Sequence, residues 1–315
     1  MLGSVAEAGG AVAERERVAE WIPTRTGVPG RSVHLSPALS GPAAAALLAL
    51  VEQDTIDSLP RLGTSHRAVV GRLVVDGRSY VVKRYLNPRL FLLKTLGQRS
   101  KAEREALSLE MIAARTGNPI EPIAWGEERA WGMSPRSWLV TSELVDSVDL
   151  RRLRRSDDPA ERAAVKEAVL RSLPGLLARL HASGVVANNL MAKNVLLQPG
   201  TGTLALIDQP HAHGGAAPLP ERLRRWDLAC LFRELRHGLS PEETRSFLRD
   251  YLEALGFGAA DLDRACADLQ RAVARRAHET PVRHLWHRLR GWFKRTRVGQ
   301  AAIGHRYDED ERGAA

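Results

Sequence analysis

Residues 185–197 read "VVANNLMAKNVLL": two valines, a polar turn and then an apolar run. Asn194 closes this turn directly before the apolar run. A second apolar run, "TLALID" at residues 203–208, follows the turn residues "QPGTG", so the two runs predict a β-hairpin. Asp208 ends the second strand of this hairpin. The stretch therefore supplies a loop asparagine and, one strand later, an aspartate at a strand end.

Upstream of this stretch, the chain is rich in predicted strands. "RAVVGRLVVDGRSYVVKRY", residues 67–85, contains two β-type runs around Asp76-Gly77, which is a strong hairpin signal. Lys83 lies on the second of these strands. A helix is expected at about 101–115, because Ser100 is a good N-cap with Glu103 as its capping-box partner. Two further strands are expected in "PIAWGEERAWGM" and "RSWLVTSEL". These elements predict a small β-rich lobe with one helix.

The rest of the chain reads as mostly helical. Asp158 can cap a helix that begins at Pro159, is kinked at Pro174 and ends near Gly184. Long amphipathic helices are expected over 219–237, 240–255 and 259–278. The predicted class is α+β with two lobes, which span 60–145 and 146–280. Residues 1–59 are interpreted as a partly loose N-terminal leader with a helix over 43–53, and residues 281–315 as a tail.

The composition of the chain limits the class of protein and the kinds of partner it can have. The 315 residues are 44% apolar and 26% charged, as expected of a globular chain, and carry a formal charge of +9. This charge favours acidic partners. Nucleic acid is the weakest of these interpretations, because no nucleic-acid-binding motif accompanies the basic residues. The two cysteines form no CxxC pair, which argues against a zinc site or a disulfide scaffold and favours the cytoplasm. The apolar run at 43–51 is too short to span a bilayer.

Four polar residues occur in an order that suits phosphoryl transfer from ATP: Lys83 on a strand, Glu105 on a helix, and then Asn194 and Asp208. A lysine can hold the α- and β-phosphates while a glutamate orients it, and an asparagine and an aspartate can hold the bridging metal. Each residue also has a simpler interpretation, as a solvated edge charge, a turn residue or a helix cap. Glu110 is the alternative to Glu105.

Several segments together resemble the lipopolysaccharide kinase family, which includes Kdo kinases and core heptose kinases. They are "SYVVKRY", "SKAEREALSLE", "LVTSEL", "LARLHASGVVANNLMAKNVLL", "LALID" and "RRWDLACLFREL", within roughly residues 60–255. The resemblance implies a two-lobed protein-kinase-like fold, ATP with Mg²⁺, and a hydroxyl of a sugar or lipid-linked glycan as acceptor. It also implies that Lys83 and Glu105 bind nucleotide, that Asn194 and Asp208 bind metal, and that Asp227 braces the catalytic loop.

The chain departs from the family pattern at several positions. No GxGxxG loop precedes Lys83, and the metal motif reads Asp208-Gln209-Pro210. The loop carries Ala187 and Asn189 where a His and the catalytic Asp are usual. A neutral amide is a far poorer base than a carboxylate, so Asn189 predicts an attenuated kinase or an inactive pseudokinase that serves as a nucleotide-binding scaffold.

Two further features of the sequence have more than one interpretation. His211 and His213 follow Asp208 and could replace the missing base or join Asp208 in a metal site, although solvent-facing histidines are the simpler interpretation. Residues 281–297, "PVRHLWHRLRGWFKRTR", have the pattern of a basic amphipathic helix. This helix could lie on the inner face of an anionic membrane or pack on the helical lobe.

Overall fold

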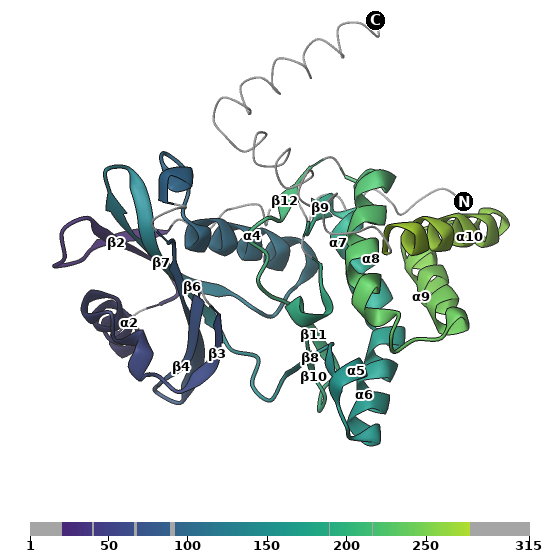
Figure 1. Ribbon diagram of the computed structural model, residues 1–315, viewed down its shortest axis with the longest axis horizontal. Coiled ribbons are helices and arrows are strands. Elements are labelled where there is room, and N and C mark those ends of the chain that lie inside the picture. Colours follow the sequence, from purple (N-terminus) through teal and green to yellow (C-terminus); the bar gives the residue numbers. More distant parts are fainter. Residues whose placement is uncertain are drawn as a thin grey trace, which may run out of the picture.

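The computed structural model describes residues 21–39, 41–65, 68–88, 92–188, 190–215 and 217–277. The chain forms two lobes, one built on a large sheet and one built mainly of helices (Figure 1). The chain passes from the first lobe to the second between β7 (Met133–Ser142) and β8 (Val148–Asp149). This division agrees with the α+β class expected from the sequence.

The first lobe contains a seven-stranded antiparallel sheet in the order β1-β2-β6-β7-β5-β4-β3. Besides β7, its strands are β1 (Ile22–Arg25), β2 (Arg31–Leu35), β3 (Arg61–Ser65), β4 (Ala68–Val75), β5 (Arg78–Leu86) and β6 (Pro122–Ala130). The hairpin predicted at Asp76-Gly77 is confirmed: both residues have positive φ, 49° and 74°, as a two-residue turn of this kind requires. Lys83 on β5 pairs with Val70 and Leu139, near the centre of the sheet.

Strands β1 and β2 correct the sequence interpretation, which expected no strand before residue 60. β2 pairs with β6 from Arg31↔Glu128 to Leu35↔Ala124, and its Val33 and Leu35 are buried. Five residues with two inward-facing apolar side chains are a weak pattern until the partner strand is known. Part of the expected leader therefore belongs to the sheet.

Helices cover both faces of the sheet. α2 (Gly41–Gln53) packs on Val82 and Val140, whereas α4 (Lys101–Thr116) packs on the face that carries Leu139. Successive side chains of a strand point to opposite faces, so Lys83, the neighbour of Val82, points toward α4. The predicted cap of α4 is present, since the Ser100 hydroxyl accepts a hydrogen bond from the Glu103 N–H at 3.1 Å.

The second lobe contains α5 (Arg152–Arg155), α6 (Pro159–Arg171), α7 (Leu173–Ala182), α8 (Glu221–Leu235), α9 (Pro241–Ala254) and α10 (Ala259–Ala277). α6 and α7 replace the single kinked helix expected from residue 159. They are separated at Ser172, and Pro174 lies in the first turn of α7, where its missing N–H costs nothing. The long helices expected over 219–237, 240–255 and 259–278 are confirmed to within a few residues.

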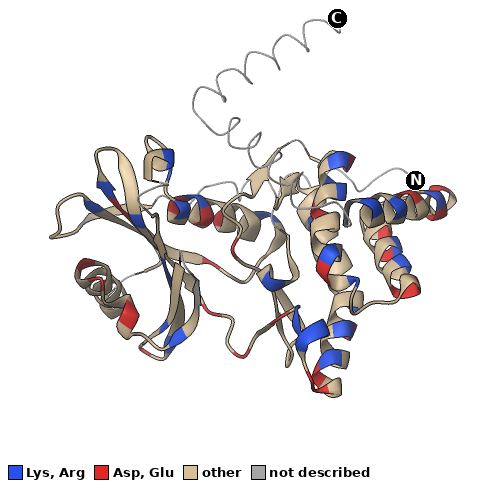
Figure 2. Ribbon diagram, viewed as in Figure 1, with Lys and Arg blue, Asp and Glu red and all other residues tan. Residues whose placement is uncertain are grey.

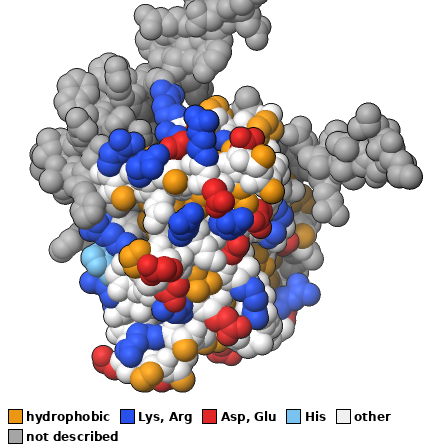
Figure 3. Space-filling view, turned by 90° about the vertical axis from the view of Figure 1, so that its right-hand side faces the viewer, with side chains coloured by type: hydrophobic (Ala, Val, Ile, Leu, Met, Phe, Trp, Pro, Cys, Tyr) orange, Lys and Arg blue, Asp and Glu red, His pale blue; other side chains and the backbone are white. Residues whose placement is uncertain are grey.

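Two small sheets complete this lobe. One joins β8 to the hairpin of β10 (Val195–Gln198) and β11 (Thr203–Leu206), and the other pairs β9 (Val185–Val186) with β12 (His213–Gly214). None of the described helices has the length and hydropathy needed to cross a membrane. Over the end of the helical lobe, acidic and basic side chains are interspersed (Figure 3). The positive charge of the chain is therefore not gathered into one stripe on that face.

Candidate functional site

Lys83 and Glu105 form a buried ion pair between the sheet and α4. Lys83 Nζ lies 2.7 Å from Glu105 Oε1, and the Glu105 side chain is fully buried. The second carboxylate oxygen of Glu105 accepts a hydrogen bond from the Tyr85 hydroxyl. Because Lys83 and Tyr85 are two residues apart on β5, both point to the α4 face and hold one carboxylate between them. Glu105, rather than the alternative Glu110, is therefore the partner of the strand lysine.

The charge state of this pair follows from its surroundings. Burial alone would lower the pKa of Lys83, but the negative charges of Glu105 and Asp208 outweigh burial and raise it. Burial raises the pKa of Tyr85 well above its ordinary value, and the same two carboxylates raise it further. The ammonium group of Lys83 is therefore charged at neutral pH, and it lies within the electrostatic field of Asp208.

Asn194 and Asp208 lie side by side at one end of the small hairpin. Asn194 is the last residue of η3 (Ala192–Asn194), and its carbonyl accepts a hydrogen bond from the Ile207 N–H at 2.9 Å. Asp208 follows Ile207 with a left-handed φ of 52°, an uncommon conformation that is often found at functional sites. The structure thus brings Lys83, Glu105, Asn194 and Asp208 to one place, as their order in the sequence suggested.

The Asp208 carboxylate remains partly accessible. Its side chain is 30% exposed, and Lys101 Nζ lies 3.6 Å from its Oδ1 atom. Lys101 also lies over the ring of Tyr85, at 4.2 Å from the ring centroid. Carboxylate and amide oxygens are the ligands that Mg²⁺ prefers, so the donors of Asp208 and Asn194 fit a magnesium site. Gln209, the next residue, is fully buried and donates its amide to the Ile207 carbonyl.

Asp227 on α8 holds the loop that precedes η3. Its carboxylate is fully buried and accepts hydrogen bonds from the Ala187 N–H at 2.7 Å and the Asn188 N–H at 2.8 Å. A carboxylate that accepts two backbone N–H groups fixes the path of the chain at that point. This geometry is the one that the family resemblance implied for Asp227.

Two further residues that hold the site in place, His181 and Asn118, were not identified from the sequence. His181, fully buried on α7, has Nδ1 2.8 Å from the Tyr251 hydroxyl and Nε2 3.4 Å from Asp227 Oδ2. Asn118, just after α4, accepts the Leu206 N–H at 2.7 Å and donates to the Leu206 carbonyl. In the sequence, Asn118 only follows the helix expected at about 101–115, and His181 is one residue of the helix expected from Pro159 to near Gly184. Their partners are about 40 to 90 residues away, so no local pattern reveals them.

The remaining candidate residues either lie outside the described part of the chain or do not form the metal site considered for them. Asn189 and the amphipathic segment 281–297 lie outside the described residues. His213 pairs with Val186 in the β12–β9 ladder, and its Nδ1 lies 3.1 Å from the Asn188 amide nitrogen. Among the described residues, no group of three or more His, Cys, Asp or Glu side chains could hold a metal. The alternative metal site of His211, His213 and Asp208 is therefore not formed.

A family model described as the lipopolysaccharide kinase (Kdo/WaaP) family matches residues 56–251, which include every residue of this site. The chain belongs to the lipopolysaccharide kinase family. Among solved structures, this family member is similar to one described as "WaaP in complex with acyl carrier protein". The similarity has a TM-score of 0.52 and 23% identity, and it covers 76% of this chain and 97% of the other. No curated protein matches the chain.

The family and this structural match show a kinase-like fold, and membership of the lipopolysaccharide kinase family implies phosphoryl transfer with ATP. In such folds, catalysis depends mainly on positioning and on charges around the transferred phosphoryl group. The buried Lys83–Glu105 pair, the loop held by Asp227 and the adjacent Asn194 and Asp208 supply that kind of preorganised charge.

Proposed function

We propose that the chain binds ATP with Mg²⁺ and transfers the γ-phosphoryl group to a hydroxyl of a sugar or lipid-linked glycan. The observation that carries this proposal is the ion pair of Lys83 with Glu105, 2.7 Å long, within the field of Asp208. Lys83 would hold the α- and β-phosphates, and Glu105 and Tyr85 would keep its side chain in place. Asn194 and Asp208 would hold Mg²⁺, which neutralises phosphate charge when it is bound.

Nucleotide binding is tested by thermal unfolding with ATP and Mg²⁺. At a ligand concentration of one hundred times Kd, binding adds about 2.7 kcal/mol to the free energy of unfolding. For a chain of 315 residues, with an entropy of unfolding of about 2.1 cal/mol/K per residue, we expect Tm to rise by about 4 °C. Lys83→Ala and Asp208→Ala should abolish the rise, whereas Lys166→Ala, on a surface of α6, should keep it. An unchanged Tm in the parent protein would contradict the proposal.

A catalytically inactive pseudokinase is the second candidate function, and Asn189 favours it. An amide can orient an acceptor hydroxyl but removes its proton poorly. General base catalysis contributes about 10²–10⁴-fold to rates. If the chain is an attenuated kinase, Asn189→Asp should raise the rate of ATP turnover by a factor in that range, with ATP affinity unchanged. A rate that stays at the parent level in this variant would favour the scaffold function.

A further inference from the structure

Three large apolar side chains are exposed together at one end of the sheet. They are Trp131, in the turn between β6 and β7, and Leu93 and Leu96, in and just after η2 (Leu93–Thr95). Trp131 is 91% exposed, Leu93 75% and Leu96 56%. Figure 1 shows η2 beside the end of the β6–β7 hairpin. We call these three residues the apolar tip. Single exposed apolar side chains are ordinary, whereas a group of them marks an interaction site.

Hydrogen bonds fix η2 to the hairpin. The Gly97 N–H donates to the Gly132 carbonyl at 3.2 Å, and the Ser134 N–H donates to the Thr95 hydroxyl at 2.9 Å. A Cβ atom on Gly132 would lie 3.2 Å from Leu96 Cδ1, so Leu96 lies against the turn. The apolar tip is therefore one preformed surface, although its residues come from two separate segments of the chain.

The turn that carries Trp131 does not favour this residue. The pair Ala130↔Met133 closes the turn, and φ is positive at both central residues, 55° and 75°. Such turns prefer Asn, Asp or Gly at the first central position, and the β4–β5 hairpin of the same sheet has Asp76 there. A left-handed conformation is unfavourable for a large side chain, and Trp131 is almost fully exposed, so packing offsets little of this cost. A residue that is kept against its local preference indicates a function.

The segment around η2 has the composition of a membrane-surface element. Residues 87–102, "NPRLFLLKTLGQRSKA", contain four basic residues, five Leu or Phe residues and no acidic residue. Lys94 and Arg99 of this segment are exposed, and Figure 2 shows basic charge on η2. Basic residues beside exposed apolar ones suit the boundary between lipid headgroups and acyl chains. Tryptophan is enriched at that depth, because its ring is apolar and its N–H is polar.

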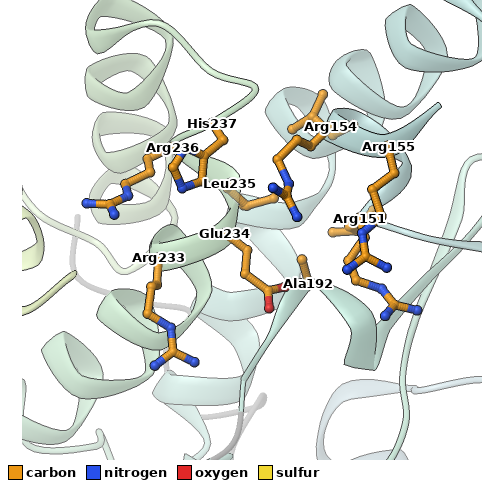
Figure 4. Close-up of a pocket in the computed structure, with 11 residues that line it drawn as sticks. Arg151, Arg154, Arg155, Ala192, Arg233, Glu234, Leu235, Arg236 and His237 are labelled. Atoms are coloured by element: carbon orange, nitrogen blue, oxygen red, sulfur yellow. The ribbon is translucent and has the colours of Figure 1, made fainter. Parts of the chain in front are cut away.

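A second group of basic residues has a different setting. Between α5 and the C-terminal end of α8, five arginines line a pocket of about 260 Å³ (Figure 4): Arg151, Arg154, Arg155, Arg233 and Arg236. The leucines that line this arginine-lined pocket, Leu150, Leu153 and Leu235, belong to the buried core. The pocket therefore has basic charge without exposed leucines, and its arginines provide a control for the effect of charge alone.

We infer that the apolar tip docks the protein on an anionic lipid bilayer. Trp131, Leu93 and Leu96 would enter the interfacial layer, while Lys94 and Arg99 would face the lipid phosphates. The tip lies at the end of a hairpin, beside η2 (Figure 1). Lipid can close around such a tip, whereas a protein partner would need a hollow of matching shape.

Docking through the tip would also place the candidate site near the membrane surface. α4 begins at Lys101, five residues after Leu96, and Lys101 Nζ lies 3.6 Å from Asp208 Oδ1. Five residues of chain span at most about 18 Å. The docking itself requires neither nucleotide nor Lys83, so this inference and the proposed function can fail separately.

The first test is co-sedimentation of the full chain with vesicles of equimolar phosphatidylcholine and phosphatidylglycerol. We expect binding that weakens as salt is added. Trp131→Asn with Leu96→Ser should weaken binding by about tenfold or more, because two apolar side chains no longer leave water. Asparagine suits this turn, so the Tm of that variant should not fall for lack of a turn residue.

Two matched controls separate the tip from general stickiness and from net charge. Val74→Ser removes an exposed apolar side chain elsewhere on the sheet and should leave binding nearly unchanged. Lys94→Glu with Arg99→Glu should weaken binding. Arg154→Glu with Arg155→Glu makes the same change in net charge at the arginine-lined pocket and should not. Equal losses in the two charge variants would overturn the inference.

Hydroxyl-radical footprinting reads the tip directly, whichever other segment contacts lipid. Trp131 should be oxidised readily in the free chain, and the same vesicles should remove most of this reactivity. Phe257, also exposed, is the control and should stay equally reactive. Lys83→Ala should lose ATP binding and keep the protection of Trp131.

Three results would overturn the inference. One is unchanged oxidation of Trp131 in the presence of vesicles. Another is equal vesicle binding by the parent chain and the variant with Trp131→Asn and Leu96→Ser. The third is protection of Trp131 that grows with protein concentration without vesicles, because this would assign the tip to a contact between copies of the chain.

Discussion

At the scale of single residues, the site depends on buried carboxylates that are fully engaged. Glu105 is shared by Lys83 and Tyr85, and Asp227 is shared by two backbone N–H groups. A buried charge is costly unless it is paired and hydrogen-bonded. Removing one partner of such a pair is therefore strongly destabilising, by about 3–5 kcal/mol for a buried ion pair. These residues both shape the site and stabilise the fold.

We predict that Asp227→Asn destabilises the chain by about 3 kcal/mol, because one amide NH₂ group would face a backbone N–H that needs an acceptor. Urea unfolding measures the loss. Hydrogen exchange should become faster at the amides of Ala187 and Asn188, which lose their acceptor. Asp157→Asn, at an exposed position, is the control and should change neither quantity. Unchanged exchange at these two amides would contradict the role of Asp227 in holding the loop.

At the scale of elements, the sheet explains how the site is assembled. The two-residue alternation of β5 sends Val82 to the α2 face and Lys83 to the α4 face. Asn118 then ties the end of α4 to β11, the strand that leads to Asp208. The backbones of β2 and β6 also approach each other closely, at Gly126. A Cβ atom on Gly126 would lie 2.8 Å from the Ser32 carbonyl oxygen.

Gly126→Ala should therefore push β2 away from β6, because backbone atoms cannot yield as a flexible side chain can. We expect a loss of about 1–3 kcal/mol in the free energy of unfolding. Limited proteolysis should become faster within residues 22–35. Gly63→Ala serves as the control, because its Cβ atom would meet no other atom within 4 Å. Equal stability of the two variants would argue against the close β2–β6 pairing.

At the scale of the whole molecule, three apolar clusters among the described residues stabilise the two lobes. One lies between α2 and the sheet, and one between α4 and the opposite face of the sheet. The largest lies among the helices of the second lobe. The cluster under α4 includes Ala205 of β11, so it links the lobes directly beside the site. The site is therefore coupled to the stability of the whole chain, and its titration should appear in global unfolding.

The pH dependence of unfolding tests this coupling. In unfolded chains, Tyr and Lys have pKa values of about 10 and 10.4. The folded-state pKa values of Tyr85 and Lys83 are raised, so above about pH 10 the unfolded chain has released protons that the folded chain still holds. These two groups thus stabilise the fold fully at lower pH and lose that contribution as pH rises through their folded-state pKa values.

We accordingly expect the free energy of unfolding, measured with urea and tryptophan fluorescence, to fall as pH rises above about 10. Tyr85→Phe removes one of the two groups, so its decline should be shallower than that of the parent chain. A decline of equal steepness in the two proteins would show that Tyr85 does not titrate as its surroundings require.

The sequence by itself determined the local elements and the order of the site residues. The Asp76-Gly77 hairpin, the Ser100 cap and the long helices follow from backbone and side-chain preferences that act over a few residues, so they could be predicted. The alternating strand around Lys83 and the turn closed at Asn194 have the same origin. Asn189 in place of an acid is also a property of the sequence alone.

Tertiary structure alone decided which distant residues meet. β2 became a strand because β6 offers it a partner, and β1 became a strand because it pairs with β2. The helix expected from residue 159 became two elements within the packed core. His181, Asn118 and the arginine-lined pocket depend on contacts between segments far apart in the chain. Local propensity cannot encode such contacts, because their energy arises only when packing brings the partners within hydrogen-bonding distance and excludes water.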